Sequence, residues 1–179
     1  PENAIRSYPI NALGLTSYDN ITANGKNGIK SGVTTDADGE ASLTIKELTL
    51  NISATVNDAI NAEQLLSIES GTLNISAADD AVHCDLVLNI GADGTDGPTI
   101  DIAESYEGLE AAELNVLSGN ISILSSDDCL NAAKSDLSNY DFSMNISGGT
   151  INAYSSEGDG FGGGDRPSGD PPQKPTSKA

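Results

Sequence analysis

Pairs of acidic or amide residues recur along this chain of 179 residues, each followed two positions later by an apolar residue. The pairs are Asn57-Asp58, Asp79-Asp80, Tyr106-Glu107 and Asp127-Asp128. Internal repetition of this kind usually means that similar structural units stack on one another, so that equivalent residues form a column in space. A column of carboxylates is destabilised by charge repulsion unless a cation lies among them.

A third polar position belongs to the same acidic column. Directly after the apolar residue come Lys30, Asn61, His83, Glu110 and Asn131. If the repeats are parallel strands, neighbouring members lie about 4.8 Å apart. Calcium relieves carboxylate repulsion and takes oxygen ligands, whereas one His and no thiolate pair suit zinc poorly. The column therefore predicts at least one bound calcium ion; the alternative is that Asp and Asn only make local hydrogen bonds in turns.

The composition limits the partners of the chain. Eight Lys and Arg face 27 Asp and Glu, a formal net charge of -19, which argues against binding to nucleic acid or anionic lipid. No apolar stretch approaches the roughly 20 residues that span a bilayer, so we expect no membrane insertion. Cys84 and Cys129 have neither metal-site nor disulfide-framework spacing and are predicted to be small buried residues.

Three sets of apolar residues recur in phase and define the elements that must position the column. Alternation of apolar and polar residues around each of them indicates short, half-buried strands. The sets are Leu43, Leu66, Leu88, Leu114 and Met144; Leu50, Leu73, Ile100, Ile121 and Ile151; and Ile29, Ile60, Val82, Leu109, Leu130 and Phe161. One short repeat, from Ile60 to Val82, takes 22 residues. Three short strands in about 22 residues are typical of one turn of a triangular parallel β-helix.

We therefore predict an all-β protein, a right-handed parallel β-helix of about five to six coils with three short strands each. Extra residues fall between the strands, so 31–41, 91–98 and 132–141 are expected to be projecting loops. A β-sandwich is the alternative, because alternating strands with Gly turns also suit it. The equal phase of the three apolar sets favours the helix.

The two ends differ from the middle. Residues 1–25 contain apolar residues without a full coil pattern and are predicted to be an N-terminal cap or incomplete coil. Residues 26–161 form the predicted β-helix. Residues 162–179 are rich in Gly and Pro, contain little apolar matter, and are predicted to be a flexible tail.

Several stretches carry a resemblance to a known family. They are Gly71–Val82 (GTLNISAADDAV), Ser105–Ala112 (SYEGLEAA), Ser125–Ala133 (SSDDCLNAA) and Gly148–Ala153 (GGTINA). Together they resemble the carbohydrate-binding parallel β-helix family of secreted bacterial proteins, over about residues 26–164. The Ser-Tyr-Glu-Gly-Leu-Glu run is the specific part, since Gly-Thr-Ile-Asn runs occur in many β-helices.

The resemblance implies a right-handed parallel β-helix that holds calcium in its acidic turns and binds cellulose and acidic polysaccharide such as polygalacturonate. It also implies a fold shared with pectate-type polysaccharide lyases. By position, the implied calcium ligands are Asp79, Asp80, Glu107, Glu110, Asp127 and Asp128, with Asp58 as a further candidate. The first pair departs from the pattern through Asn57 and Ala59, and the glycine of the motif is Ala81 or Cys129 in two coils.

We expect a non-catalytic, calcium-binding module for plant cell-wall polysaccharide, secreted or on the bacterial cell surface and tethered through its ends. The candidate sugar contacts are Tyr106, His83, Asn131 and Lys134. For His83 and Tyr106 the alternative is a hydrogen-bonding residue and a ring lying over its neighbours. Two other functions stay open. One is a calcium-dependent lyase, which needs a base such as Lys134; the other is a structural surface repeat or filament subunit.

Overall fold

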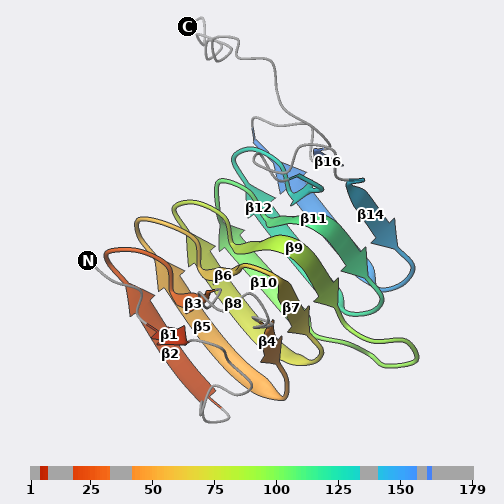
Figure 1. Cartoon of the computed structure of the whole chain (residues 1–179), viewed down its shortest axis with the longest axis horizontal. Coiled ribbons are helices and arrows are strands. Elements are labelled where there is room, and N and C mark those ends of the chain that lie inside the picture. The colour runs from red at the N-terminus through yellow and green to blue at the C-terminus, as the bar shows by residue number, and fades with distance from the viewer. Residues whose placement is uncertain (1–4, 8–17, 33–41, 134–140, 157–160, 163–179) are drawn as a thin grey trace, which may run out of the picture.

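A computed structural model of the chain shows an all-β solenoid (Figure 1). It describes residues 5–7, 18–32, 42–133, 141–156 and 161–162. Within these ranges every regular element is a strand, and no helix there is long and apolar enough to cross a membrane.

The strands are short, and most alternate between buried and exposed residues. In chain order they are β1 (Ile5–Ser7), β2 (Tyr18–Ala23), β3 (Ile29–Ser31), β4 (Ser42–Ile45), β5 (Leu48–Ala54), β6 (Ile60–Ala62), β7 (Leu65–Ile68), β8 (Gly71–Ala77), β9 (Val82–Ile90), β10 (Thr99–Glu104), β11 (Leu109–Val116), β12 (Asn120–Ser125), β13 (Leu130–Asn131), β14 (Ser143–Ile146), β15 (Thr150–Ser155) and β16 (Phe161–Gly162).

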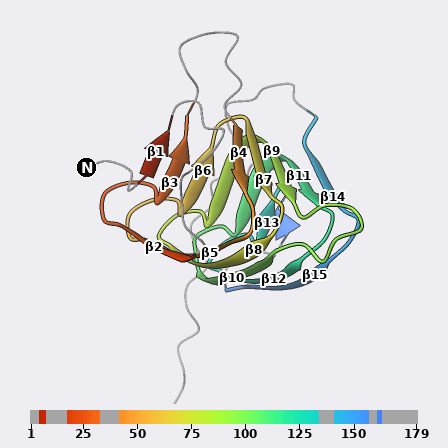
Figure 2. The same cartoon turned by 90° about the horizontal axis from the view of Figure 1, so that it is seen from below.

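Two parallel sheets form the walls of the solenoid (Figure 2). One has six strands in the order β15-β12-β10-β8-β5-β2, and the other has ten, with β1-β3-β6-β9-β11-β13-β16 as its main path. The other three strands of this sheet lie off the main path: β7 pairs with the C-terminal half of β9, β14 pairs with the C-terminal half of β11, and β4 pairs with β7. All strand pairs in the described residues are parallel, whereas sandwiches are built from antiparallel sheets, so the sandwich alternative is wrong.

The number of turns is smaller than predicted. The uninterrupted stretch 42–133 makes about four turns, not five to six, because the sequence count treated every recurrence of the apolar pattern as a complete coil. Further strands pair onto both ends of this stack, from β1 to β3 and from β14 to β16. The right-handed sense of the coil stays a prediction.

The wall is also less divided than predicted. In β9 and β11 the last segment of one coil runs directly into the first segment of the next, with a shift of register between Ala111 and Glu113. Two sheets, one of them bent, therefore replace three separate ones. The predicted loop 91–98 does separate β9 from β10, while most of 31–41 and 132–141 lies outside the described residues.

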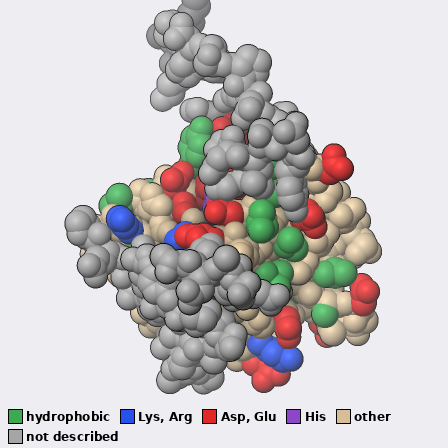
Figure 3. Space-filling view, in the orientation of Figure 1, with side chains coloured by type: hydrophobic (Ala, Val, Ile, Leu, Met, Phe, Trp, Pro, Cys, Tyr) green, Lys and Arg blue, Asp and Glu red, His purple; other side chains and the backbone are tan. Residues whose placement is uncertain are grey.

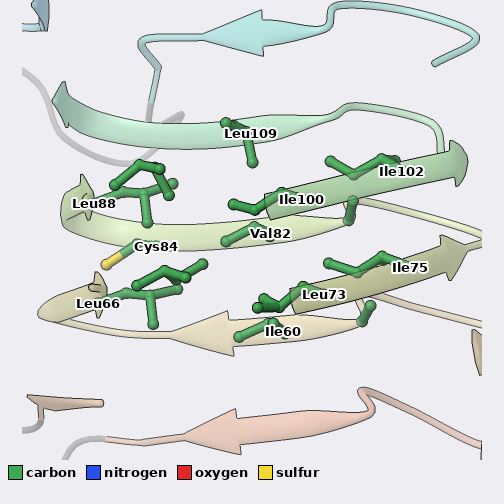
Figure 4. Close-up of a cluster of buried hydrophobic side chains, with 14 of the residues drawn as sticks. Ile60, Leu66, Leu73, Ile75, Val82, Cys84, Leu88, Ile100, Ile102 and Leu109 are labelled. Atoms are coloured by element: carbon green, nitrogen blue, oxygen red, sulfur yellow. The ribbon is translucent and has the colours of Figure 1, made fainter. Parts of the chain in front are cut away.

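The register within each sheet follows the three apolar sets. Leu66 pairs with Leu88, Leu73 with Ile100, and Val82 with Leu109. Their side chains stack in the interior (Figure 4) and are almost completely buried, together with Cys84. Because the side-chain period of a strand is two, a slip of one residue would expose a whole apolar set, so burial specifies the register.

Only part of the two predicted end segments lies within the described residues. Strand β1 pairs with β3 and strand β2 with β5, so parallel pairing already involves residues before the predicted start of the β-helix at residue 26. A capping role for residues 1–25 stays a prediction. Apart from Gly162, the predicted tail 162–179 lies outside the described residues.

Candidate functional site

The acidic column forms where the chain turns from the six-stranded sheet into the ten-stranded sheet. Backbone hydrogen bonds join its members from coil to coil: Ala59 N donates to Asp80 O at 3.0 Å, and Gly108 N donates to Asp128 O at 2.9 Å. Ala81 N donates to the carbonyl oxygen of the intervening Glu107 at 2.9 Å. The predicted stacking of the second residue of each pair is thereby confirmed.

The third polar position stacks as predicted. Lys30 pairs with Asn61, Asn61 with His83, His83 with Glu110, and Glu110 with Asn131. The preceding residues on these strands are core residues, so alternation directs this ladder away from the interior. Asp and Glu side chains gather near the middle of the face drawn in Figure 3.

Small residues make this stacking possible. One position before the apolar residue, a Cβ atom on Gly108 would lie 2.3 Å from the carbonyl oxygen of Cys129 and 2.7 Å from Cγ2 of Ile123. The equivalent Ala59 and Ala81 are fully buried, so those coils accept a methyl group. The coils with Ala59 and Ala81 therefore stack although these residues replace the glycine of the motif.

Three carboxylates from two neighbouring coils converge in the column. Oxygens of Asp58, Asp79 and Asp80 lie within 4.8 Å of one another, and we call these residues the aspartate cluster. Asp58 and Asp80 are only 5% and 8% exposed. Burial raises the pKa of Asp58 even though Asn61 donates a hydrogen bond to its Oδ2 at 2.6 Å. Burial raises the pKa of Asp80 to about 6 against the opposing hydrogen bond from His83. A cation here would remove repulsion that the buried carboxylates otherwise bear.

A second group surrounds the imidazole of His83. Its Nδ1 lies 3.0 Å from Oδ2 of Asp80 and 3.4 Å from Oε1 of Glu110, and its Nε2 lies 2.9 Å from Oδ1 of Asp85. Burial opposes protonation, but hydrogen bonds to Asp80 and Asp85 and the charge of Glu110 outweigh it and raise the pKa of His83. The raised pKa favours the protonated, cationic form of His83 among these carboxylates.

Glu107, Glu110 and Asn131 continue the column into the next coils. Nδ2 of Asn131 donates to Oε2 of Glu107 at 3.0 Å and to Oε2 of Glu110 at 3.3 Å. Burial, and then the neighbouring Glu107, raise the pKa of Glu110. Oδ1 of Asn131 is buried and has no hydrogen-bond partner in the described structure.

The structure divides the predicted ligands into three groups. Asp58, Asp79 and Asp80 share the aspartate cluster, and Asp80 and Glu110 share His83. Within the described part of the chain, no such convergent group includes Glu107, Asp127 or Asp128. Sequence reasoning missed Asp85, although its place two residues after His83 on one strand puts both side chains on the same face.

The predicted sugar contacts also separate. Tyr106 is 48% exposed, whereas the side chain of His83 is 15% exposed and Asn131 only 9%, and both are engaged with carboxylates. For His83 the geometry favours the hydrogen-bonding alternative. Lys134 lies outside the described residues.

The outer face of the six-stranded sheet carries ladders of small polar side chains. Nδ2 of Asn51 donates to Oδ1 of Asn20 at 3.0 Å, and Nδ2 of Asn74 donates to Oδ1 of Asn51 at 2.7 Å. Grooves of about 340 and 570 Å³ lie along this face, and one of about 490 Å³, lined partly by Tyr106, lies at its edge. The face therefore offers both hydrogen-bonding groups and shallow hollows.

A family model described as "Carbohydrate-binding domain-containing protein" matches residues 15–160, most of the chain and nearly all of the solenoid. The chain belongs to this carbohydrate-binding family. No curated protein and no solved structure matches it significantly. Family membership supports a carbohydrate partner for the solenoid, in agreement with the resemblance seen in the sequence.

Of the two convergent groups in this carbohydrate-binding domain, the aspartate cluster fits calcium better. All its donor atoms are carboxylate oxygens, the ligand type that calcium prefers. The group around His83 offers a nitrogen and already contains a cation, which suits calcium less well.

Proposed function

We propose that this carbohydrate-binding domain binds plant cell-wall polysaccharide without cleaving it and holds calcium at the aspartate cluster. The observation that supports the metal is the convergence of three carboxylates within 4.8 Å, two of them with a raised pKa. The family match supports the carbohydrate. The proposed partners are cellulose and polygalacturonate, and the proposed location is secreted or on the bacterial cell surface.

Each residue of the aspartate cluster has a distinct part in this proposal. Asp58 is oriented by Asn61, and Asp80 by His83, so both carboxylates are held in place before an ion arrives. Asp79 is more exposed and closes the group from the solvent side. A bound calcium ion would supply positive charge where an acidic polymer meets a chain of net charge -19.

We propose binding without catalysis because Lys30, the lysine of the third polar position of the column, is engaged by neighbouring side chains. Uronate cleavage needs a Lys or Arg to remove the proton next to the carboxylate. The ammonium group of Lys30 lies 3.0 Å from Oε1 of Glu63 and also donates to Oδ1 of Asn61. The protein incubated with polygalacturonate and calcium should therefore give no unsaturated product; a calcium-dependent rise in absorbance that Lys134→Ala abolishes would establish the lyase instead.

A pull-down tests the binding. Wild-type protein is mixed with cellulose and with polygalacturonate gel, in calcium and in chelator, beside Asp79→Asn and the control Asp93→Asn. Asp93 is an exposed acid in the loop between β9 and β10, so the control removes the same charge outside the cluster. We expect retention of wild type and of the control on polygalacturonate in calcium, and loss with chelator or Asp79→Asn. Failure of wild type to bind either polymer in calcium would refute the proposal.

A further inference from the structure

A groove on the outer face of the six-stranded sheet combines an apolar platform with a row of polar groups. It has a volume of about 570 Å³ and lies across β10, β12 and β15. Leu124 and Tyr154 form the platform, and Asp101, Ser122 and Asn152 form the polar row. None of these residues belongs to the acidic column.

Leu124 faces solvent by register, whereas Tyr154 lies on β15, the edge strand of the six-stranded sheet. Leu124 is 43% exposed although its strand, β12, is flanked by β10 on one side and β15 on the other. Its neighbour Ile123 points inward and is 3% exposed. Tyr154 pairs directly with Leu124 and is 67% exposed. Adjacent exposed apolar residues of this kind often mark a binding surface.

Only these later coils carry the platform. At the corresponding outward position, the earlier strands β2, β5 and β8 have Thr22, Ser53 and Ser76, which are in register with one another. On these strands the groove of about 340 Å³ is lined at its outward positions by Asn, Thr and Ser, and Asp101 and Ala103 of β10 complete its lining. An aromatic ring and a leucine line the groove of about 570 Å³ instead.

The polar row runs parallel to the platform at a suitable distance. Asp101, Ser122 and Asn152 are in register across three strands and lie two residues before the platform positions, about 7 Å along each strand. A sugar ring has apolar C–H faces and a rim of hydroxyl groups. A ring stacked on Tyr154 would present its hydroxyls to the amide of Asn152, and the next sugars of a chain lying across the strands would meet Ser122 and Asp101.

The charge of the groove selects among glycans. Among the described residues its lining contains one carboxylate, Asp101, and no Lys, Arg or His. A uronate bound here would face Asp101 without a compensating cation, whereas sugar hydroxyls can donate to it. An uncharged glycan is therefore the matching ligand, and its binding needs no calcium.

We propose that the groove over β10, β12 and β15 is the contact site for an uncharged polysaccharide chain, with one sugar stacked on Tyr154 and bonded to Asn152 and a neighbouring sugar of the same chain bonded to Asp101. This site rests on the proposed carbohydrate-binding function and gives it a surface separate from the aspartate cluster. The protein would then recognise neutral chains on one face and acidic chains at its calcium site.

Calorimetric titration of the full chain with cellohexaose, an uncharged β-glucan, in chelator tests the site. We expect binding by wild type, a rise in Kd of about tenfold for Tyr154→Ala, a smaller rise for Asn152→Ala, and a near-normal Kd for Tyr154→Phe, which keeps the ring. The matched control is Phe142→Ala, which removes another exposed aromatic ring outside this groove. Unchanged melting temperatures of the variants would show that the fold is intact.

The possible failures are distinguishable. If wild type binds cellohexaose but Tyr154→Ala binds equally well, or if Phe142→Ala loses as much affinity as Tyr154→Ala, the site is wrong and carbohydrate binding stands. Binding that requires calcium, or a Tyr154-dependent affinity for oligogalacturonate instead, would also overturn it. If wild type binds neither sugar with or without calcium, and no polymer in the pull-down, the proposed function itself fails.

Discussion

Replacing Asp79 by Asn should stabilise the protein in chelator and destabilise it, relative to wild type, in calcium. In the metal-free protein Asp79 adds repulsion to a cluster that already contains two buried carboxylates. Its charge is one of the causes that raise the pKa of Asp58. With calcium present the same carboxylate becomes a ligand, so its removal costs binding energy.

The size of both effects can be worked out. Two unit charges 4.8 Å apart repel by about 3 kcal/mol at an effective dielectric constant of about 20. Because Asp79 is partly exposed, solvent screening reduces the relief expected from Asp79→Asn to about 1 kcal/mol, or a rise in melting temperature of about 2–4 °C. Calcium at about 100 times its Kd should stabilise wild type by about 2.7 kcal/mol, and most of this gain should disappear in the variant.

Thermal melts followed by circular dichroism measure all four states, wild type and variant, each in chelator and in calcium. Asp93→Asn serves as the charge-matched control and should respond to calcium as wild type does. A variant that is no more stable than wild type in chelator would contradict the repulsion argument. An equal calcium shift in wild type and Asp79→Asn would remove Asp79 from the proposed ligands.

Three further predictions concern the parts of the solenoid that position the site. Gly108→Ala should lower the free energy of unfolding by about 2 kcal/mol or more, because the new Cβ would lie 2.3 Å from the carbonyl oxygen of Cys129. Ala81→Gly, at the equivalent position of another coil, should lower it by only about 1 kcal/mol. Urea denaturation measures both, and similar values for the two variants would contradict the close approach at Gly108. Glu47→Gly should raise the melting temperature by about 2–4 °C, because Glu47 has a φ of 56° that glycine adopts without strain. A melting temperature below that of wild type would show that the Glu47 side chain contributes more to stability than the backbone strain costs. In chelator, the stabilisation from His83 should be complete below pH 6.5 and lost as the pH rises through about 10, since its pKa is raised in the folded state. His83→Gln should therefore flatten the decline of unfolding free energy between these pH values, and an unchanged slope would mean that other groups cause it.

The solenoid was predictable because its strands obey two simple periods. Alternation placed Leu66, Leu88 and their equivalents inside, and the recurrence of about 22 residues placed them in one column, as the register confirms. The turn count was less predictable, because a recurring pattern does not show where a coil is complete. The merging of segments in β9 and β11 was missed for a related reason: apolar spacing does not show whether the chain bends between two strands.

The membership of the acidic column was a property of sequence alone, since repeats of similar length bring equivalent residues together wherever coils stack. Which of these residues converge was decided by tertiary structure. Small differences in side-chain direction bring Asp58, Asp79 and Asp80 within 4.8 Å, and they place His83 between the carboxylates of Asp80, Asp85 and Glu110. The platform of Leu124 and Tyr154 likewise exists only in the folded protein. Thirty residues separate the two along the chain, and parallel pairing makes them neighbours on the outer face.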